Sequence, residues 1–569
     1  MDKQTIRFIL LSLVIFVGFS LFSKYSKEQQ FVTKTVDGNV SSNTHGVPVE
    51  PEPDKLKDIP SEMGGKVEPT SQAAHHDFKY SVDAVIVTVD TDVLNVKINS
   101  HGDLIYAELK KYPQDNKEHQ KGFALLSEGD NRFYIAQSGL MSEVGPDSKI
   151  HGRAKFIAGK SHYSMANDDK NISVDLTYSS EEGAVKDINF IKRFIFHKNS
   201  YVIDVQYIID NNSDKEYRAS MYGRLRRYQP KSTGGFFSGG LKTYTGAAIN
   251  TPDEKYKKIS FSDMKTPYKI AFNGGWIAML EHYFVSAWVP GVNDFSEYQT
   301  EQFNDDSFGI RFVNAPINLA PGDTKTVSAK LFVGPKVSEI LKEISPALDL
   351  TVDYGVLWWL CVPLFWLLKA IFNIIGNWGW AIIFTTLLIK ILFYHLSASS
   401  YRSMGNLRKL QPKIEALKVS CGEDKQKFSQ SVMELYRKEK VNPLGGCLPI
   451  VVQIPVFISL YYVLLESVEL RQATWCMWVM DLSAKDPFYI LPIIMGISMF
   501  VQQRMNPPPP DPMQAKVLMV MPAFFTVLFL QFPSGLMLYW IVNNTLSILQ
   551  QMFITRNMDK VIATKGFKN

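Results

Sequence analysis

The sequence of 569 residues is poor in cysteine and carries little net charge. Its four cysteines all lie between Cys361 and Cys476. The long segment from residue 24 to about residue 350 therefore contains no disulfide and depends on its own hydrophobic core. The net charge of +5 is too small to indicate a nucleic-acid partner, so we expect no direct nucleic-acid function.

Motifs for metals, nucleotides and catalysis are also missing. The histidines of residues 77–345 show no metal-ligand spacing. The glycine-rich stretch STGGFFSGG lacks the Lys-Ser/Thr ending of a P-loop. No pair of residues stands out for acid–base work. We therefore expect no metal, no cofactor and no enzymatic activity.

The N-terminus carries two basic residues before an apolar run from Phe8 to Phe22. This pattern is typical of either a cleaved signal peptide or an uncleaved anchor. The run is nearly long enough to span a bilayer and no A-x-A-like cleavage site follows it, so we favour an N-terminal transmembrane anchor at residues 1–23. Residues 24–76 are rich in Gly, Ser, Thr, Pro and charge, which predicts a flexible tether.

Residues 77–345 are expected to form a large all-β domain. Runs such as DAVIVTVDTDVLNVKIN and RFIFHKNSYVIDVQYII alternate apolar and polar residues and are rich in β-branched side chains. A two-sheet sandwich is the natural way to bury so many half-apolar strands.

Apolar runs dominate the last part of the chain and predict transmembrane helices. Five candidates lie within residues 377–555: Trp378–Leu396, Cys447–Leu465, Phe488–Val501, Val517–Phe532 and Gly535–Ile554. With the anchor they make six spans. Residues 346–376 contain three tryptophans, Pro363 and Lys369. This segment could also span, but its aromatics suit the headgroup level, so we favour an amphipathic helix lying in the outer interface.

The charges of the loops predict the orientation in the membrane. The loop 398–440 has ten Lys or Arg against five Asp or Glu, whereas the loop 466–487 has four acidic and two basic residues. The tail, residues 556–569, is basic as well. The positive-inside rule places the loop 398–440 and both termini in the cytoplasm, and the β domain outside. Apolar residues at helical spacing within 398–440 predict a helical hairpin with charged outer faces.

Lys390 lies within the predicted span Trp378–Leu396, where a charge costs about 2.5–3.5 kcal/mol on insertion scales. Thr386, Tyr394 and Ser397 share its helix face and form a polar stripe. None of the five predicted spans contains Asp or Glu, so no carboxylate within them can pair with the lysine. Snorkelling to the cytoplasmic interface is one explanation.

The other explanation is a water-filled groove, open to the cytoplasm and closed outside, with the cation on its wall. We favour the groove because the polar stripe exceeds what snorkelling requires. Two of the predicted spans are also short, at 14 and 16 residues, against the usual need for about 20. Short spans thin the bilayer and would ease the passage of a polar segment.

Several motifs resemble the YidC membrane-protein insertase family. They include NWGWAIIFTTLLIK, YRKEKVNPLGGCLPIVVQIPVF and FPSGLMLYWIVNNTLSILQQ, while YTGAAINTPDEKYKK and GGWIAMLEHYFVSAWVP resemble the long form of Gram-negative bacteria. The resemblance covers nearly the whole chain outside the tether. It implies a polytopic α-helical protein of the bacterial inner membrane with six spans. Five of these form a core with a hydrophilic groove, and the all-β domain is a large periplasmic supersandwich.

The resemblance also assigns roles to single residues. Lys390 matches the family's groove cation, which is usually arginine, and lysine lacks arginine's bidentate fork. Tyr539 matches a groove tyrosine with Trp540 beside it, and Gln453 and Thr386 match groove-facing positions. The candidate substrate groove comprises Lys390, Thr386, Tyr394, Gln453, Tyr539 and Trp540.

The resemblance further implies partners. The cytoplasmic hairpin would guide the substrate through its basic residues Arg408, Lys409, Lys413, Arg437 and Lys438. The short basic tail would touch the ribosome weakly. The expected partners are nascent inner-membrane proteins, the Sec translocon, the ribosome and membrane lipids.

The predicted function is insertion and folding of inner-membrane proteins, alone or with the Sec translocon. Two alternatives come from other classes of protein. An ion-coupled transporter would be expected to have intramembrane carboxylates and paired broken helices. A membrane-anchored envelope-binding protein would use its β domain to capture a sugar or a partner.

Overall fold

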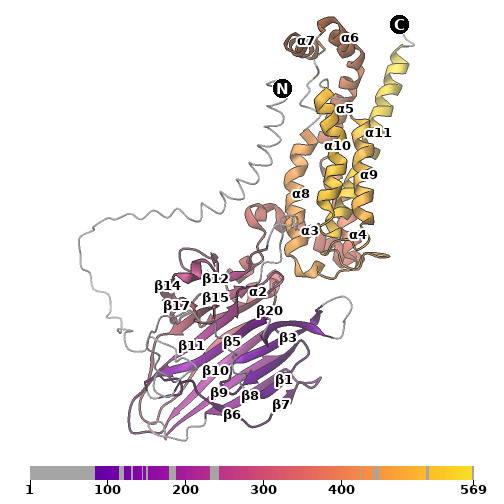
Figure 1. Cartoon of the computed structure of the whole chain (residues 1–569). Coiled ribbons are helices and arrows are strands. Elements are labelled where there is room, and N and C mark those ends of the chain that lie inside the picture. Colours follow the sequence, from indigo (N-terminus) through magenta and orange to yellow (C-terminus); the bar gives the residue numbers. More distant parts are fainter. Residues whose placement is uncertain are drawn as a thin grey trace, which may run out of the picture. The chain divides into compact units, whose positions relative to one another are not determined.

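The computed structural model describes most of the chain after residue 83. The described residues are 84–566, apart from 115–120, 130–131, 144, 149–151, 179–186, 231–242, 423, 440, 442–447 and 508–511. The expected anchor and tether lie outside them. The described residues form two compact units, 84–352 and 353–566 (Figure 1).

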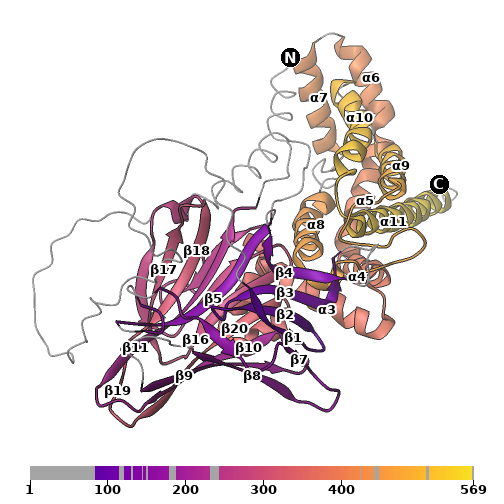
Figure 2. The same cartoon turned by 60° about the horizontal axis from the view of Figure 1, so that its bottom comes forward.

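The first unit confirms the predicted two-sheet β domain. Within the described residues the larger sheet has eleven strands and the smaller has nine, and both are mainly antiparallel (Figures 1 and 2). The order in the larger sheet is β14 (Lys269–Asn273), β17 (Phe295–Gln302), β18 (Ser307–Asn314), β11 (Tyr217–Tyr228), β5 (Arg132–Ser142), β4 (Gly122–Gly129), β3 (Leu104–Pro113), β2 (Leu94–Asn99), β1 (Val85–Asp90) and β7 (His162–Ser164), with β19 (Ile317–Leu319) paired to β11. The order in the smaller sheet is β13 (Lys257–Ile259), β12 (Gly246–Asn250), β15 (Trp276–Leu280), β16 (Phe284–Pro290), β20 (Thr324–Pro335), β10 (Val202–Asn211), β9 (Ile188–His197), β8 (Asn171–Tyr178) and β6 (Phe156–Ala158).

Alternating burial explains why the sheets stack. Along β10 every second residue is buried, including Val205 and Tyr207, as expected for strands with one face on the core. Trp288 of β16 meets Phe312 of β18 between the sheets, with ring centroids 6.0 Å apart. Gly223 of β11 lies against both rings and a Cβ there would come within 2.8 Å of Trp288, so this close approach requires glycine.

Short helices complete the first unit. They are η1 (Asp263–Lys265), α2 (Ser338–Ile344) and η2 (Leu348–Thr351). Leu341 and Leu348 are fully buried, and the indole N–H of Trp276 donates to the carbonyl of Pro346 at 3.1 Å. Residues 346–352 therefore belong to the β unit, although the sequence grouped them with the following helix.

The second unit is helical, as expected. Its helices are η3 (Gly355–Leu357), α3 (Trp358–Ile375), α4 (Trp378–Leu392), α5 (Tyr394–Lys409), α6 (Gln411–Cys421), α7 (Lys425–Lys438), α8 (Leu448–Glu466), η5 (Val468–Leu470), α9 (Ile490–Met505), α10 (Pro512–Phe529) and α11 (Ser534–Gly566). Each of the five apolar runs lies largely in one of these helices. The last helix continues into the predicted tail.

By length and composition, six of these helices fall into three groups with respect to crossing a membrane. Among the described residues, Gly355–Ile375 is by itself long and apolar enough to cross a membrane. The pair α4 and α5 passes the same test only together, across a bend of 69°. Val452–Glu466, Ile490–Met505 and Met513–Phe529 are apolar but shorter. The count of six spans therefore stays a prediction, as does the interfacial position of α3.

The bend between α4 and α5 interrupts the helix within the predicted span Trp378–Leu396. The chain leaves helical geometry at Phe393, with φ −92° and ψ 13°. Neither proline nor glycine marks this position, so the sequence carried no signal for it. A second break at Leu410 divides the first arm of the expected hairpin into α5 and α6. Consequently the hairpin itself consists of α6 and α7.

Candidate functional site

A small pocket lies between α4, α5, α8 and α11, inside the helical unit. Its volume is about 30 Å³, which is room for about two water molecules. Eleven residues line it. The polar ones are Thr386, Lys390, Ser397, Gln453, Tyr539 and Asn543. The structure thus brings together four of the six predicted groove residues.

Lys390 forms part of the pocket wall in the last turn of α4. Its Nζ donates to the Ser547 hydroxyl of α11 at 2.7 Å. Among the described residues no Asp or Glu lines the pocket or pairs with this ammonium group. An ammonium group has three N–H donors, so Lys390 has donors left for an acidic group that enters the pocket.

Thr386, Gln453 and Tyr539 surround the lysine with neutral polar groups. The Thr386 hydroxyl donates to the Ile382 carbonyl of its own helix at 2.7 Å. The Gln453 amide and the Tyr539 hydroxyl are 3.5 Å apart, which is a long and weak hydrogen bond. Both groups therefore keep hydrogen-bonding capacity for another partner.

Tyr394 and Trp540 lie outside the pocket lining. Because of the break at Phe393, Tyr394 begins a new helix and does not share the helix face of Thr386 and Lys390. Its side chain is exposed. Its backbone carbonyl accepts a hydrogen bond from the Gln550 side chain at 3.3 Å. Trp540 packs behind the pocket, with its ring 4.7 Å from that of Phe457. These two residues lie beside the pocket rather than in its wall.

Ser547, the direct partner of Lys390, is not among the residues predicted from the sequence. The signal was present, because Tyr539, Asn543 and Ser547 recur every four residues on one face of α11. Asn543 and Ser547 are both buried. This face of α11 and the Thr386–Lys390 face of α4 are the two polar faces that meet at the pocket.

Other polar groups of α11 join it to its neighbours. Asn544 donates to the Ser498 hydroxyl of α9 at 3.0 Å. Further along, Gln551 donates to the Met505 carbonyl and to the Asn506 side chain, both at 3.3 Å. These bonds fix α11, which carries one wall of the pocket, against α9.

The predicted basic residues of the hairpin are accessible. Arg408, Lys409, Lys413, Arg437 and Lys438 are all exposed. Lys413 pairs with Glu439 at 2.6 Å and so ties α6 to the end of α7. The hairpin turn is stabilised by Asp424, which caps α7 by accepting from the backbone of Gln426 and Lys427.

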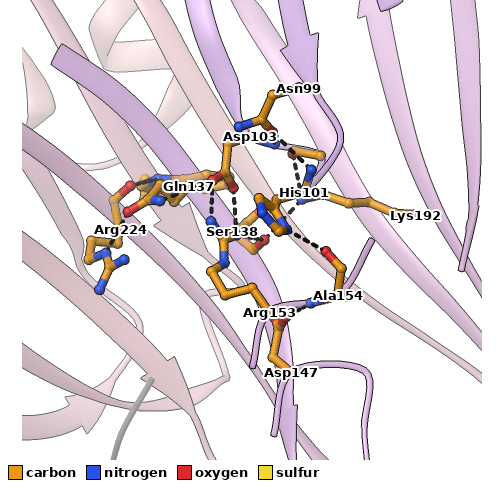
Figure 3. Close-up of polar contacts among 12 residues, drawn as sticks. Asn99, His101, Asp103, Gln137, Ser138, Asp147, Arg153, Ala154, Lys192 and Arg224 are labelled. Atoms are coloured by element: carbon orange, nitrogen blue, oxygen red, sulfur yellow. Dashed lines mark hydrogen bonds and ion pairs between the residues drawn. The ribbon is translucent and has the colours of Figure 1, made fainter. Parts of the chain in front are cut away.

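The β unit contains a second cluster of charged residues, buried between its strands (Figure 3). Arg153 donates to both carboxylate oxygens of Asp103, and one of them, Oδ2, also accepts from the Gln137 amide at 3.0 Å. The Lys192 amine donates to the carbonyls of Gly102 at 2.6 Å and Ser138 at 2.9 Å. Their side chains are nearly inaccessible, so this network stabilises the fold and is not a binding site.

The electrostatics of this cluster follow from burial and pairing. Burial opposes the charge of Asp103, but Arg153, Lys192 and Gln137 together outweigh it and hold the pKa of this carboxyl below its usual value. Burial lowers the pKa of Lys192 to about 7, although Asp103 opposes the shift. Burial also raises the pKa of Asp147.

A polar cleft of about 530 Å³ lies on the outer face of the smaller sheet. Asp204 and Gln206 of β10 and Ser328 and Lys330 of β20 line it; on both strands these residues alternate with buried ones. The Asp204 carboxylate forms a hydrogen bond with Nε2 of His197 at 2.7 Å. Among the described residues, no group of three potential metal ligands occurs.

Comparison with known proteins gives matches over nearly the whole described chain. The family described as YidC periplasmic domain matches residues 86–367, and the family described as 60Kd inner membrane protein matches residues 370–561. A protein of Pseudomonas fluorescens named membrane protein insertase YidC is 48% identical over 84% of this chain and 85% of its own length. A protein of the same name from Pseudomonas syringae is 44% identical over 98% of both chains. A crystal structure described as an active YidC insertase covers 83% of this chain and 94% of its own, with 18% identity and a TM-score of 0.37.

Proposed function

Since this chain belongs to the YidC membrane-protein insertase family, we propose that Lys390 and its pocket receive a hydrophilic, acidic segment of each protein that it inserts. Its function is membrane-protein insertion, and its substrates are nascent membrane proteins. It acts in the inner membrane and carries a periplasmic domain. The proposal concerns the means by which a polar segment enters the helical unit.

The observation that carries the proposal is the incomplete pairing of Lys390. Its one hydrogen-bond partner among the described residues is a neutral hydroxyl. A charge in a poorly hydrated site is attracted strongly to an opposite charge, because screening is weak there. A carboxylate on the entering segment would supply that charge and lower the cost of its own desolvation.

The neighbouring groups extend the site for the substrate. We assign Gln453 and Tyr539 to hydrogen bonding with the polar backbone of the segment, because their mutual bond is long and easily exchanged. Thr386 adds polar wall, and Tyr394 and Trp540 flank the entrance and the back of the pocket. The pocket must widen to admit a polypeptide, so the segment enters a groove that opens as it binds.

Helix length supports a thinned bilayer beside this groove. Helix α9 has 16 residues and α10 has 18, or about 24 and 27 Å at 1.5 Å per residue, against a hydrocarbon core of about 30 Å. A short apolar helix draws the bilayer thinner. We place six spans in the membrane, with both termini and the hairpin in the cytoplasm.

The hairpin and the tail serve the cytoplasmic partners in this proposal. The exposed basic residues of α5 to α7 guide the substrate and make weak contact with the ribosome, as does the basic end of α11. Insertion proceeds alone or beside the Sec translocon. The proposed mechanism does not couple insertion to ion transport, since no described residue that lines the pocket is Asp or Glu.

The proposal is tested by insertion of a small single-span protein with an acidic outer segment into proteoliposomes. Purified wild-type protein is compared with Lys390→Ala, Lys390→Glu and Lys390→Arg. We expect Ala and Glu to abolish most insertion and Arg to retain it, because only Arg keeps the positive charge. Protease protection of the outer segment measures the yield.

Lys369→Ala is the matched control. This lysine also lies in an apolar helix, α3, but its ammonium group is near the ring of Phe365 and away from the pocket lining. Equal insertion by all Lys390 variants would refute the role of the cation and would leave bilayer thinning as the mechanism.

A further inference from the structure

Ser547 is placed to control the position of Lys390. Its hydroxyl accepts from Lys390 Nζ at 2.7 Å and donates to the carbonyl of Asn543, one turn earlier on α11, also at 2.7 Å. The serine is 2% exposed, so water competes little for either bond. Tyr401 of α5 also approaches this hydroxyl.

We propose that Ser547 is a positioning residue that holds the ammonium group of Lys390 in the pocket until a carboxylate of the substrate engages it. This inference rests on the function proposed above and adds Ser547, which has no role in that proposal. The bond to Asn543 uses the only proton of the hydroxyl. The oxygen lone pairs are therefore directed away from that carbonyl and are available to Lys390.

A lysine needs such a partner more than an arginine does. Its side chain has about 2 kcal/mol of rotamer freedom to lose, and without a partner it can extend towards the cytoplasmic interface. The bond to Ser547 keeps Nζ at the pocket wall and leaves other N–H donors free. Preorganisation of this kind strengthens binding because the ordering is complete before the ligand arrives.

Arginine would present a planar fork that engages a carboxylate with two bonds by itself. The dependence on Ser547 should therefore be specific to lysine at position 390. A test can therefore separate positioning from a general structural role. If Ser547 were only structural, its loss would lower insertion equally with lysine and with arginine at position 390.

The experiment measures insertion into proteoliposomes of two versions of one single-span protein. The first has an acidic outer segment, and in the second the acidic residues are replaced by their amides. Ser547→Ala should lower insertion of the acidic version about tenfold, as for loss of one hydrogen bond to a charged group, and leave the amide version unchanged. Ser547→Thr keeps the hydroxyl and should therefore retain the wild-type preference for the acidic version.

The same substitution is then made in the Lys390→Arg protein. We expect Lys390→Arg/Ser547→Ala to insert the acidic version nearly as well as Lys390→Arg alone. Ser498→Ala is the matched control, because Ser498 likewise accepts from another helix, from Asn544 of α11, and donates within its own helix, but its partner is not Lys390.

The outcomes are distinguishable. Equal losses for both versions, or equal losses with lysine and arginine, would show a structural role and overturn the inference while the proposed function stands. No loss in Ser547→Ala, with loss in Lys390→Ala, would overturn it as well. Full insertion by Lys390→Ala would refute the proposed function and this inference together.

Discussion

Lys192 is buried and Lys390 is half-buried, and their surroundings give them different properties. Lys192 donates to two backbone carbonyls and lies within 5.7 Å of three aromatic ring centroids. Lys390 has one hydroxyl partner and faces a pocket. A polar group whose partners are all internal stabilises a fold, whereas one with unused donors beside a cavity is available to a ligand. The contrast favours Lys390 as the functional cation.

Lys192 makes the stability of the β unit depend on pH. Burial lowers its pKa to about 7 in the folded state, against about 10.4 when the chain is unfolded. Between these values the unfolded chain binds one more proton, so the free energy of unfolding rises with pH. We expect a rise of about 1 kcal/mol per pH unit from about pH 7 to pH 9, measured by urea unfolding of residues 84–352 with the fluorescence of Trp276 and Trp288.

Lys192→Met removes the titrating group and serves as the comparison. The variant should be less stable at pH 9, because the Gly102 and Ser138 carbonyls lose their donor. Its unfolding free energy should nevertheless lack this rise with pH. The residues 84–352 contain no cysteine, so no thiol titrates in this window. If the free energy of unfolding changed with pH equally in the wild-type protein and in Lys192→Met, the Lys192 amine would still be protonated at pH 9 in the folded state.

At the scale of secondary structure, apolar periodicity predicted most elements because it reports burial directly. The alternating run that contains Val205 and Tyr207 became β10, and each of the five long apolar runs within residues 377–555 lies mainly in a helix. Pro412, in the first turn of α6, did mark the break at Leu410, but the break at Phe393 could not be predicted, since neither proline nor glycine stands there. Tyr394 was misplaced for that reason: the helical spacing that linked it to Lys390 ends one residue before it.

Only part of the pocket could be predicted, because the sequence pattern does not show how the helices pair. Lys390, Thr386, Gln453 and Tyr539 are unusual residues for apolar helices, so their positions were visible in the sequence. Ser547 is a common helix residue in membrane proteins, and only the helix pairing reveals its partner. Which of the many polar residues of α11 faces α4 depends on the rotation of the helix, which the sequence pattern leaves open.

Helices α9 and α10 approach closely at Gly496. A Cβ at this glycine would lie 2.1 Å from the Thr526 hydroxyl oxygen. The threonine cannot rotate away freely, because it is β-branched and its hydroxyl donates to the Pro522 carbonyl at 2.7 Å. Gly496→Ala should therefore lower stability by about 1–3 kcal/mol, the usual cost of overpacking, measured as the thermal midpoint in detergent.

Gly405→Ala provides the control within α5. A Cβ there would meet only the end of the Met558 side chain at 3.3 Å, which is flexible. This substitution should leave stability unchanged or raise it by up to about 1 kcal/mol through helix propensity. Thr526→Ala should rescue Gly496→Ala by removing the clashing oxygen. Failure of that rescue would place the strain elsewhere than between α9 and α10.

At the scale of the whole molecule, the two units have separate cores. The β unit ends with residues that pack on its own strands, such as Leu348, whereas Tyr354 already bonds to Ser467 of the helical unit. Helix α3 belongs to the second unit: Phe372 stacks on Trp378 with centroids 4.0 Å apart, and Cys361 donates to the Ser459 carbonyl. The structural boundary therefore precedes α3, although the periplasmic family match extends to residue 367.

This boundary predicts the result of deleting the β unit. A chain that lacks residues 84–352 keeps α3 to α11 and the pocket, so it should retain most insertion of a small client in proteoliposomes. Extending the deletion to residue 375 removes α3 and uncovers Trp378 and the buried side of α8, which should destabilise the helical unit by several kcal/mol and abolish insertion. Loss of insertion in the shorter deletion, with the helical unit still folded, would instead give the β unit, and its polar cleft, a direct part in the reaction.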